Sequence, residues 1–415
     1  MATLLPFPGL VVKSEWADQV VTGPYDAYTP EQRIKISREN PYSFLNVTKS
    51  REDLPEESRD DVENLLANCS DAMNLLYEAD VYNSYDEPSL FLYRLEIEGH
   101  TQTGVMGLLP VTDDDDQQIL RHELFRPGRA QLMAHHLMTV GASSSPVSLT
   151  YRSDKALEEE MTRLCLNEPE LISNNEGVLQ TVWVVSGDDA QKLSSLFEEK
   201  TFYVTDGHHR LAAASEARDL FGDAGGPLNH IQAVLFPDSE MLVLPFHRQI
   251  QDRKDRTPEE LFDSLTAIGS LTSRENVSEA RPDAGQVGIY LNHSWYTMNL
   301  PSSSSNRVVD QLDVSRLQDG ILKPLFDIED PGNDPVISYV PEPVGVATLE
   351  SQCDATGSIG FILPPTSINE LMAVADAGER MPPKSSYFEP KPRSGVFVRR
   401  LDREAGWVDP QTNDC

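Results

Sequence analysis

The stretch that decides the fold reads Thr201-Phe202-Tyr203-Val204-Thr205-Asp206-Gly207-His208-His209-Arg210, and it continues as Leu211-Ala212-Ala213-Ala214. β-Branched and aromatic residues over 201–205 predict a buried strand, and the alanine-rich run predicts a helix over 208–221. Asp206-Gly207 is a turn signal between the two, and we expect Asp206 to cap the helix. The stretch therefore predicts a strand–turn–helix unit of an α/β protein.

The first turn of this predicted helix carries side chains that packing does not require. Its unpaired N–H groups and the positive end of the helix dipole attract anions. Arg210 can hold a phosphate through two parallel hydrogen bonds, and His208 or His209 can donate to it or move a proton. The alternative is a capped helix whose histidines only satisfy local hydrogen bonds. Two adjacent histidines and an arginine beside a glycine turn favour the anion site.

Strand and helix patterns alternate on both sides of this unit. Strands are predicted at 89–97, 103–110, 147–151, 179–185, 232–236 and 286–291, and helices at 30–39, 57–78, 117–125, 129–139, 153–166 and 257–267. We expect the helix over 117–125 to end at Arg126-Pro127-Gly128, because proline and glycine stop helices.

These elements predict a mixed α/β (α+β) fold, with a central mixed sheet and flanking helices. We divide the chain into an N-terminal α/β module at 1–102, a central core with the motif at 103–254, and a C-terminal α/β region at 255–415.

The charge, the apolar runs and the cysteines of the chain indicate which kinds of binding partner and which cellular compartment to expect. The chain has 67 acidic and 34 basic residues, a formal net charge of −33, which disfavours binding to nucleic acid or an anionic membrane. No apolar run approaches the roughly 20 residues of a membrane-spanning helix. The four cysteines lie far apart without CxxC spacing, which is typical of a reducing compartment, so we expect a cytoplasmic protein. The expected partner is a small molecule; no pattern specifies a metal-ligand set or an oligomeric state.

A second candidate segment is Arg121-His122-Glu123. Glu123, with His122 beside it, can serve as a general base or a metal ligand. The alternative is a polar helix on which Glu123 pairs with Arg126 at the surface.

A third candidate is the basic, proline-rich stretch over 380–400. Its charged residues are Arg380, Lys384, Lys391, Arg393, Arg399 and Arg400, against Glu389 alone. Prolines hold such a loop extended and stiff, so we predict that Lys384 or Arg393 contacts an anion. The alternative is pairing with the acidic remainder of the chain. His247-Arg248 is a lesser candidate, which can equally be an ordinary strand end.

Several motifs together resemble a known family. They are Pro24-Tyr25-Asp26, Asn40-Pro41-Tyr42-Ser43-Phe44-Leu45, His122-Glu123, Asp206-Gly207-His208-His209-Arg210, Leu235-Phe236-Pro237 and Met381-Pro382-Pro383-Lys384-Ser385. In this order they are similar to the domain-of-unknown-function family 1015, which implies no function by itself. His247 stands where the family pattern has asparagine, which leaves an altered substrate or a lost activity open.

The Asp206–Arg210 turn is also similar to the nucleotide-phosphate-binding motif of the ParB and sulfiredoxin superfamily, which includes free-serine kinases. This resemblance implies a ParB/sulfiredoxin-like core with N- and C-terminal elaborations. It implies that Asp206, His208, His209 and Arg210 hold nucleotide phosphates around Gly207. From the charge of the basic stretch, Lys384 and Arg393 are added as candidates for phosphate binding. The catalytic candidates are then Glu123 as the base, with His122, His208 and Asp206.

The function that this resemblance implies is a phosphotransferase that uses ATP or ADP with Mg²⁺ to phosphorylate a small hydroxylated metabolite such as serine. A phosphoester hydrolase is the first alternative, in which a histidine protonates the leaving group. A regulatory protein that binds a nucleotide or metabolite without turnover is the second.

Overall fold

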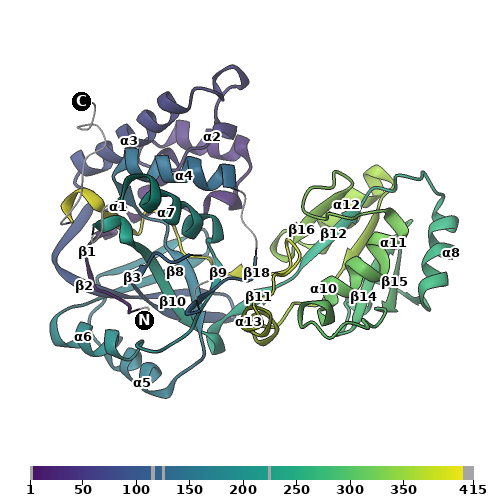
Figure 1. Ribbon diagram of the computed structural model, residues 1–415. Coiled ribbons are helices and arrows are strands. Elements are labelled where there is room, and N and C mark those ends of the chain that lie inside the picture. The colour runs from purple at the N-terminus through teal and green to yellow at the C-terminus, as the bar shows by residue number, and fades with distance from the viewer. Residues whose placement is uncertain (1–2, 114–116, 124–126, 223–225, 405–415) are drawn as a thin grey trace. The chain divides into compact units, whose positions relative to one another are not determined.

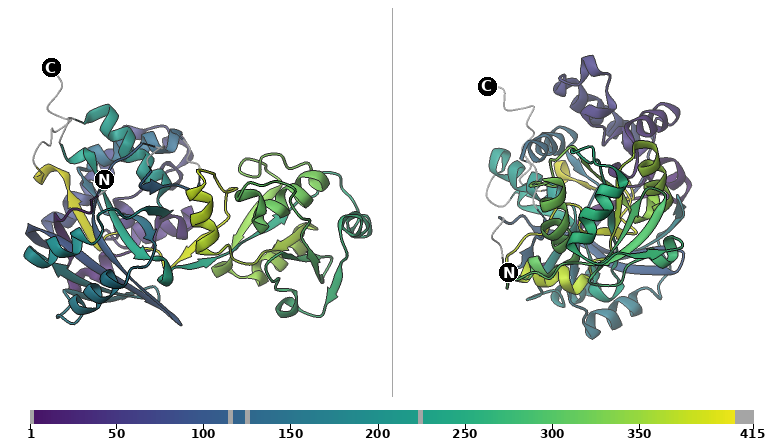
Figure 2. Two further views of the ribbon diagram at one scale, coloured as in Figure 1. Left: turned by 60° about the horizontal axis from the view of Figure 1, so that its bottom comes forward. Right: turned by 90° about the vertical axis from the view of Figure 1, so that its right-hand side faces the viewer.

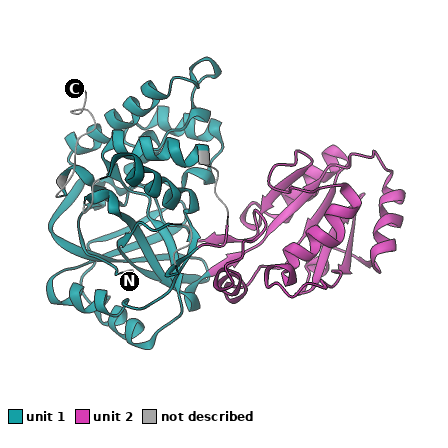
Figure 3. Ribbon diagram, viewed as in Figure 1, with its two compact units in different colours: residues 1–120, 125–241, 390–415 teal, residues 121–124, 242–389 magenta. Residues whose placement is uncertain are grey.

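The computed structural model describes residues 3–113, 117–123, 127–222 and 226–404. The chain divides into two compact units, shown in Figure 3. Unit 1 comprises residues 1–120, 125–241 and 390–415, and unit 2 comprises residues 121–124 and 242–389. Unit 1 therefore joins the start, the middle and the end of the sequence, whereas the predicted division ran in three consecutive ranges.

The described strands of unit 1 form an eleven-stranded sheet with the order β4-β9-β6-β10-β3-β2-β1-β19-β5, to which β8 adds beside β2 and β7 beside β8. The strands are β1 (Phe7–Val12), β2 (Tyr82–Ile97), β3 (His100–Pro110), β4 (Ile119–Leu120), β5 (Ala142–Ser143), β6 (Val147–Tyr151), β7 (Leu171–Asn175), β8 (Val178–Val185), β9 (Phe202–Asp206), β10 (His230–Pro237) and β19 (Phe397–Arg400). β10 pairs with β6 in parallel and β6 with β9 antiparallel. The predicted mixed sheet is confirmed.

Helices cover both faces of this sheet (Figure 1). They are α1 (Ser14–Val20), α2 (Pro30–Glu39), α3 (Val62–Glu78), α4 (Pro127–Val140), α5 (Lys155–Leu164), α6 (Gly187–Ser195) and α7 (His208–Phe221). On one face, Leu65 and Met73 of α3 share a core with Phe91 of β2. On the other, Leu157 of α5 and Leu193 of α6 pack into a separate core. Both faces of the sheet are thus buried, which places its functional groups at strand ends and loops.

The predicted helix over 117–125 is wrong within the described residues. Ile119–Leu120 instead forms β4, which pairs in parallel with β9. α4 begins at Pro127, where a helix end was predicted. Proline lacks an N–H and fixes φ, so it suits the first turn of a helix as well as it stops one. Arg126 lies outside the described residues, so its predicted ion pair with Glu123 stays a prediction.

Unit 2 contains a sheet of the order β13-β15-β14-β17-β12-β16 and a two-stranded ribbon of β11 and β18. Its strands are β11 (Leu242–Leu244), β12 (Phe246–Ile250), β13 (Thr272–Arg274), β14 (Gln286–Leu291), β15 (Ser294–Asn299), β16 (Ile337–Pro341), β17 (Ile359–Ile362) and β18 (Tyr387–Glu389). Its helices are α8 (Pro258–Ile268), α9 (Val277–Ala280), α10 (Asp313–Leu317), α11 (Lys323–Phe326), α12 (Val346–Thr356) and α13 (Ile368–Asp376).

The core of unit 2 lies where α12 packs on its sheet. Leu349 and Cys353 of α12 meet Ile362 of β17 and Tyr290 of β14 there, and all four side chains are buried. Figure 2 shows the elements of both units from two further sides. None of the helices in the described part of the chain is long and apolar enough to cross a membrane.

Candidate functional site

The predicted strand–turn–helix is confirmed around Gly207. β9 ends at Asp206, and α7 begins at His208, so His208, His209 and Arg210 form its first turn. The expectation that Asp206 caps α7 is corrected, because Gly207 occupies the N-cap position. Gly207 has φ +102°, and a Cβ there would lie 3.0 Å from Arg210 Nε. The turn therefore needs glycine both for its left-handed backbone and for the approach of the guanidinium.

The carboxylate of Asp206 is held between two cations. One is Arg210, whose Nη2 donates to Oδ2, and the other is Lys391, whose Nζ lies 3.3 Å from Oδ1. Burial alone would raise the pKa of Asp206, but the charges of Lys391 and Arg210 outweigh it and lower the pKa to about 2. Asp206 is therefore ionised at neutral pH and fixes both cations at the start of α7.

Lys391 links this turn to the N-terminal part of unit 1. Its Nζ also lies 3.1 Å from Oδ2 of Asp26, a carboxylate whose side chain is 57% exposed. Neither Lys391 nor Asp26 was among the predicted site residues. The sequence placed Lys391 in the basic stretch over 380–400 and Asp26 in the Pro24-Tyr25-Asp26 motif. Neither observation indicates that the two side chains are in contact.

Arg210 is also anchored on its other side. Its Nη1 donates to the carbonyl of Pro146 at 2.6 Å, immediately before β6. The Thr205 hydroxyl of β9 donates to the Ser148 hydroxyl of β6 at 3.0 Å, which ties the two strands together. The Arg210 side chain remains 24% exposed. Its guanidinium is thus held in one orientation while part of it still faces solvent.

Buried polar side chains brace the segment 390–394. Gln102 Nε2 donates to the carbonyl of Pro390 at 2.9 Å. The Tyr93 hydroxyl accepts from the N–H of Arg393 at 3.2 Å and donates to Gln180 Oε1 at 2.5 Å. Gln102, Tyr93 and Gln180 are all buried in the sheet. The backbone is thus fixed on both sides of the lysine that contacts Asp206.

Arg393 contacts a different part of unit 1. Its Nη2 donates to the carbonyl of Asn175 at 3.4 Å, and its Nη1 lies 3.9 Å from Oε2 of Glu176. Its side chain also crosses Gly23, where a Cβ would lie 2.9 Å from Nη1. Both polar contacts of Arg393 are long, and its predicted contact with phosphate stays a prediction.

The remaining predicted residues, His122, Glu123 and Lys384, belong to unit 2. There the carbonyl of His122 accepts from the N–H of Met381 at 2.8 Å. Arg380 Nη1 likewise donates to the carbonyl of Arg121 at 2.6 Å. The segment 121–123 therefore packs against the start of the basic stretch that carries Lys384, and the predicted roles of these residues stay predictions.

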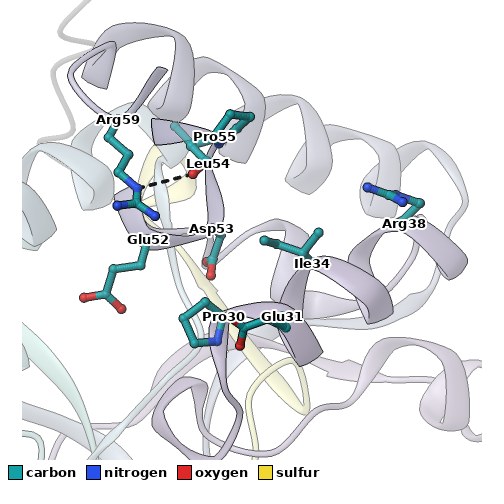
Figure 4. A pocket seen from close by; sticks show the side chains of 9 residues that line it. All are labelled: Pro30, Glu31, Ile34, Arg38, Glu52, Asp53, Leu54, Pro55 and Arg59. Atoms are coloured by element: carbon teal, nitrogen blue, oxygen red, sulfur yellow. Dashed lines mark hydrogen bonds between the residues drawn. The ribbon is translucent and has the colours of Figure 1, made fainter. Parts of the chain in front are cut away.

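A hollow of about 550 Å³ lies between α2 and the segment 51–59 of unit 1 (Figure 4). Its lining consists of Pro30, Glu31, Ile34, Arg38, Glu52, Asp53, Leu54, Pro55 and Arg59. None of the predicted site residues lines it. In the described part of the chain, no group of three histidine, cysteine, aspartate or glutamate side chains is placed to hold a metal ion.

Comparisons with known proteins identify a family and several similar structures. The family model described as "Protein of unknown function (DUF1015)" matches residues 4–315. The match includes His122-Glu123 and the turn at 206–210, whereas Met381–Ser385 lies beyond it. No curated protein matches the sequence.

The similar structures include a mutant of free serine kinase in complex with AMP, at 11% identity and a TM-score of 0.39, covering 72% of this chain and 92% of that one. A complex of the same mutant with ADP has 10% identity, a TM-score of 0.39 and the same coverage. C-terminally truncated SbnI from Staphylococcus aureus has 13% identity and a TM-score of 0.38, covering 70% of this chain and 85% of that one.

Proposed function

Because the chain belongs to family DUF1015, whose description gives no function, we propose a function from the geometry of unit 1. The start of α7 binds the phosphates of a nucleotide, and the protein transfers a phosphoryl group to the hydroxyl of a small metabolite such as serine. The observation that carries this proposal is the placement of Arg210 and Lys391 on Asp206, directly at the N-terminus of α7.

This arrangement meets the electrostatic needs of a nucleotide phosphate. Two cations and the N–H groups of a helix start offer positive charge and directional donors to its oxygens. Asp206 holds the cations in place before a ligand arrives, so little of the binding energy is lost in ordering them. Phosphoryl transfer depends mostly on such positioning and charge neutralisation.

Asp26 adds a second carboxylate to the proposed site. Because Asp26 and Asp206 both contact the ammonium of Lys391, the two carboxylates lie close together. Mg²⁺ is commonly held by one or two carboxylates and the phosphates of a substrate. These two residues therefore have the chemistry to hold Mg²⁺, and Glu123 is the candidate base for the acceptor hydroxyl.

Calorimetry with ADP and ATP, with and without Mg²⁺, tests the proposal. Arg210→Ala is expected to weaken nucleotide binding at least about tenfold, since it removes a charge-assisted contact. The control is Arg218→Ala, at the far end of α7, where the guanidinium pairs with Asp113; it is expected to leave binding unchanged. An absence of nucleotide binding, or equal affinity after Arg210→Ala, would overturn the phosphate site.

Product analysis separates the three functions. Release of AMP or ADP that depends on an added hydroxyl compound such as serine supports phosphoryl transfer. Phosphate release from a monoester without nucleotide supports the hydrolase, in which a histidine at the start of α7 would protonate the leaving group. Nucleotide binding with neither product supports the regulatory protein.

A further inference from the structure

Two cationic residues of unit 2, Arg248 and Lys384, are in contact through the backbone of Lys384, and the proposed function uses neither. Arg248, on β12, is 3% exposed. Its Nη1 donates to the carbonyl of Phe246 at 2.5 Å and its Nη2 to the carbonyl of Lys384 at 3.2 Å. The guanidinium also lies 5.5 Å from the ring centre of Tyr339 on β16. All these partners are carbonyls or a ring, and none is a carboxylate.

The acid that directly follows the neighbouring strand β16 is already engaged by other cations. Glu342, just after β16, lies 2.6 Å from His247 Nε2 through one oxygen and 2.6 Å from Arg281 Nη2 through the other. His247 and Arg248 point to opposite faces of β12, because side chains alternate along a strand. Glu342 therefore does not neutralise Arg248. Burial lowers the pKa of Arg248 to about 10, yet at neutral pH it keeps its charge.

Lys384 is placed beside Arg248 by a braced loop. Its backbone is left-handed, with φ +55°, a conformation that is unfavourable for a non-glycine residue and is often found at binding sites. The Ser385 hydroxyl donates to the carbonyl of Pro382 at 2.6 Å, and Arg248 holds the carbonyl of Lys384 itself. The exposed ammonium lies 5.1 Å from the ring centre of Phe246. Phe246 and Arg248 share one face of β12, so both cations lie on that face.

A cation pair of this kind is unfavourable in the absence of an anion. A buried charge without an opposite partner is strongly unfavourable, and two like charges close together repel each other. Neither Arg248 nor Lys384 forms an ion pair with a carboxylate in the described part of the chain. The protein has a net charge of −33, so its sequence contains many acidic side chains that could pair with these cations.

We propose that Arg248 and Lys384 form a binding site for a phosphate monoester. A monoester carries between about 1.5 and 2 negative charges at neutral pH, which matches two cations, whereas one carboxylate would leave a positive charge uncompensated. The site takes a phosphorylated metabolite, and all its residues come from unit 2. The start of α7, where the nucleotide site is proposed, belongs to unit 1.

Isothermal titration of the full-length protein with glycerol 3-phosphate tests this site, with D-glycerate as the carboxylate probe. The experiment uses Arg210→Ala, which removes the main contact of the α7 site, and the double variant Arg210→Ala with Lys384→Asn. Asparagine removes the charge and still accepts a left-handed backbone. The matched control replaces Lys323, an exposed lysine of unit 2 that pairs with Glu329, in the variant Lys323→Gln.

We expect Arg210→Ala alone to retain binding of glycerol 3-phosphate and the added Lys384→Asn to weaken it at least about tenfold. Lys323→Gln in the same background is expected to have no effect, and Arg248→Lys is expected to weaken binding because it loses the planar fork. Loss of binding in Arg210→Ala alone, an unchanged affinity after Lys384→Asn, or equal binding of D-glycerate would overturn the proposal. A failure of nucleotide binding would leave this result intact, since the probe contains no nucleotide.

Discussion

Lys391 Nζ lies 3.3 Å from Asp206 Oδ1, although the two residues belong to widely separated segments of the chain. The contact joins the start of α7 to the C-terminal segment of unit 1. Asp206 is ionised at neutral pH because of this contact and that with Arg210. The proposed phosphate site is thus a product of tertiary structure and does not reside in the turn at 206–210 alone.

Replacing Lys391 by methionine tests that contribution. The variant keeps most of the side-chain length but removes the charge, so we expect ADP binding to weaken at least about tenfold. The control is Lys155→Met, since Lys155 is 88% exposed and pairs with its helical neighbour Glu159. Calorimetry gives the two dissociation constants. Equal affinity in the Lys391→Met protein and the wild type would exclude Lys391 from the site.

Gly207→Ala tests whether the turn geometry matters for both folding and binding. An added Cβ meets a φ of +102° and the Arg210 guanidinium at 3.0 Å, so we expect a loss of about 1–3 kcal/mol in stability and weaker ADP binding. Gly128→Ala, in α4, is the matched control: nothing lies within 4 Å of its Cβ, and alanine should stabilise the helix by about 0.5–1 kcal/mol. Thermal unfolding and calorimetry measure both effects. Wild-type values for the Gly207→Ala protein would contradict the role given to this glycine.

Glu123→Gln tests the predicted base once a hydroxyl acceptor has been found. Removing a general base is expected to lower kcat about 100-fold or more, while ADP affinity stays unchanged. Glu159→Gln, at an exposed position of α5, serves as the comparison. Turnover within about tenfold of the wild type would show that another group accepts the proton, and Asp26 would be the next residue to replace.

The pair of His247 and Glu342 predicts how the stability of the protein depends on pH. Burial would raise the pKa of Glu342, but its hydrogen bonds to His247 and Arg281 outweigh burial and lower it from 4.5 to about 2. A carboxyl whose pKa is lower in the folded state stabilises the protein above its unfolded pKa and loses that contribution as the pH falls. We therefore expect the stability that Glu342 contributes to be complete above about pH 5 and to be lost between that pH and 2.

The variant Glu342→Gln has no such titration. It is expected to be less stable than the wild type at pH 7, and the difference should shrink as the pH is lowered from 5 to 3. Urea unfolding at a series of pH values measures this difference. A gap between the two proteins that stays constant with pH would contradict the prediction.

Sequence patterns predicted the helices correctly where capping residues or a glycine turn next to the helix determine its ends. α2 was predicted at its observed bounds, and Thr29 and Gln32 form its capping box, with Pro30 in the first turn. α7 was likewise predicted at its observed bounds, after the glycine turn. The helix predicted over 117–125 failed because the pairing of β4 with β9 decides that segment. Proline at position 127 is compatible with a helix start and a helix end alike, so local reasoning could not choose between them.

The sequence likewise predicted the contiguous part of the candidate site but not its long-range contacts. Asp206 to Arg210 are contiguous, so their turn could be read from the sequence. The contacts of Lys391 with Asp206 and Asp26 depend on how distant segments pack. Net charge along the stretch over 380–400 indicated an anion site or ion pairing, and the structure adds that Lys391 and Lys384 of this stretch belong to different units. Arg248 was only a lesser candidate in the sequence. That it forms no ion pair with a carboxylate among the described residues is seen only in the folded chain.

Unit 1 contains β19, which pairs antiparallel with β1, so Gly9 faces Arg399. Ribosomes make the chain from its N-terminus, and domains generally fold as units as they emerge. All of residues 242–389 are therefore synthesised before the strand that borders β1 and before Lys391. A nascent chain that has just completed unit 2 already holds the 206–210 turn but lacks the ammonium group that contacts it. On the proposed function, nucleotide binding at this turn is thus expected to begin only after Lys391 has been synthesised.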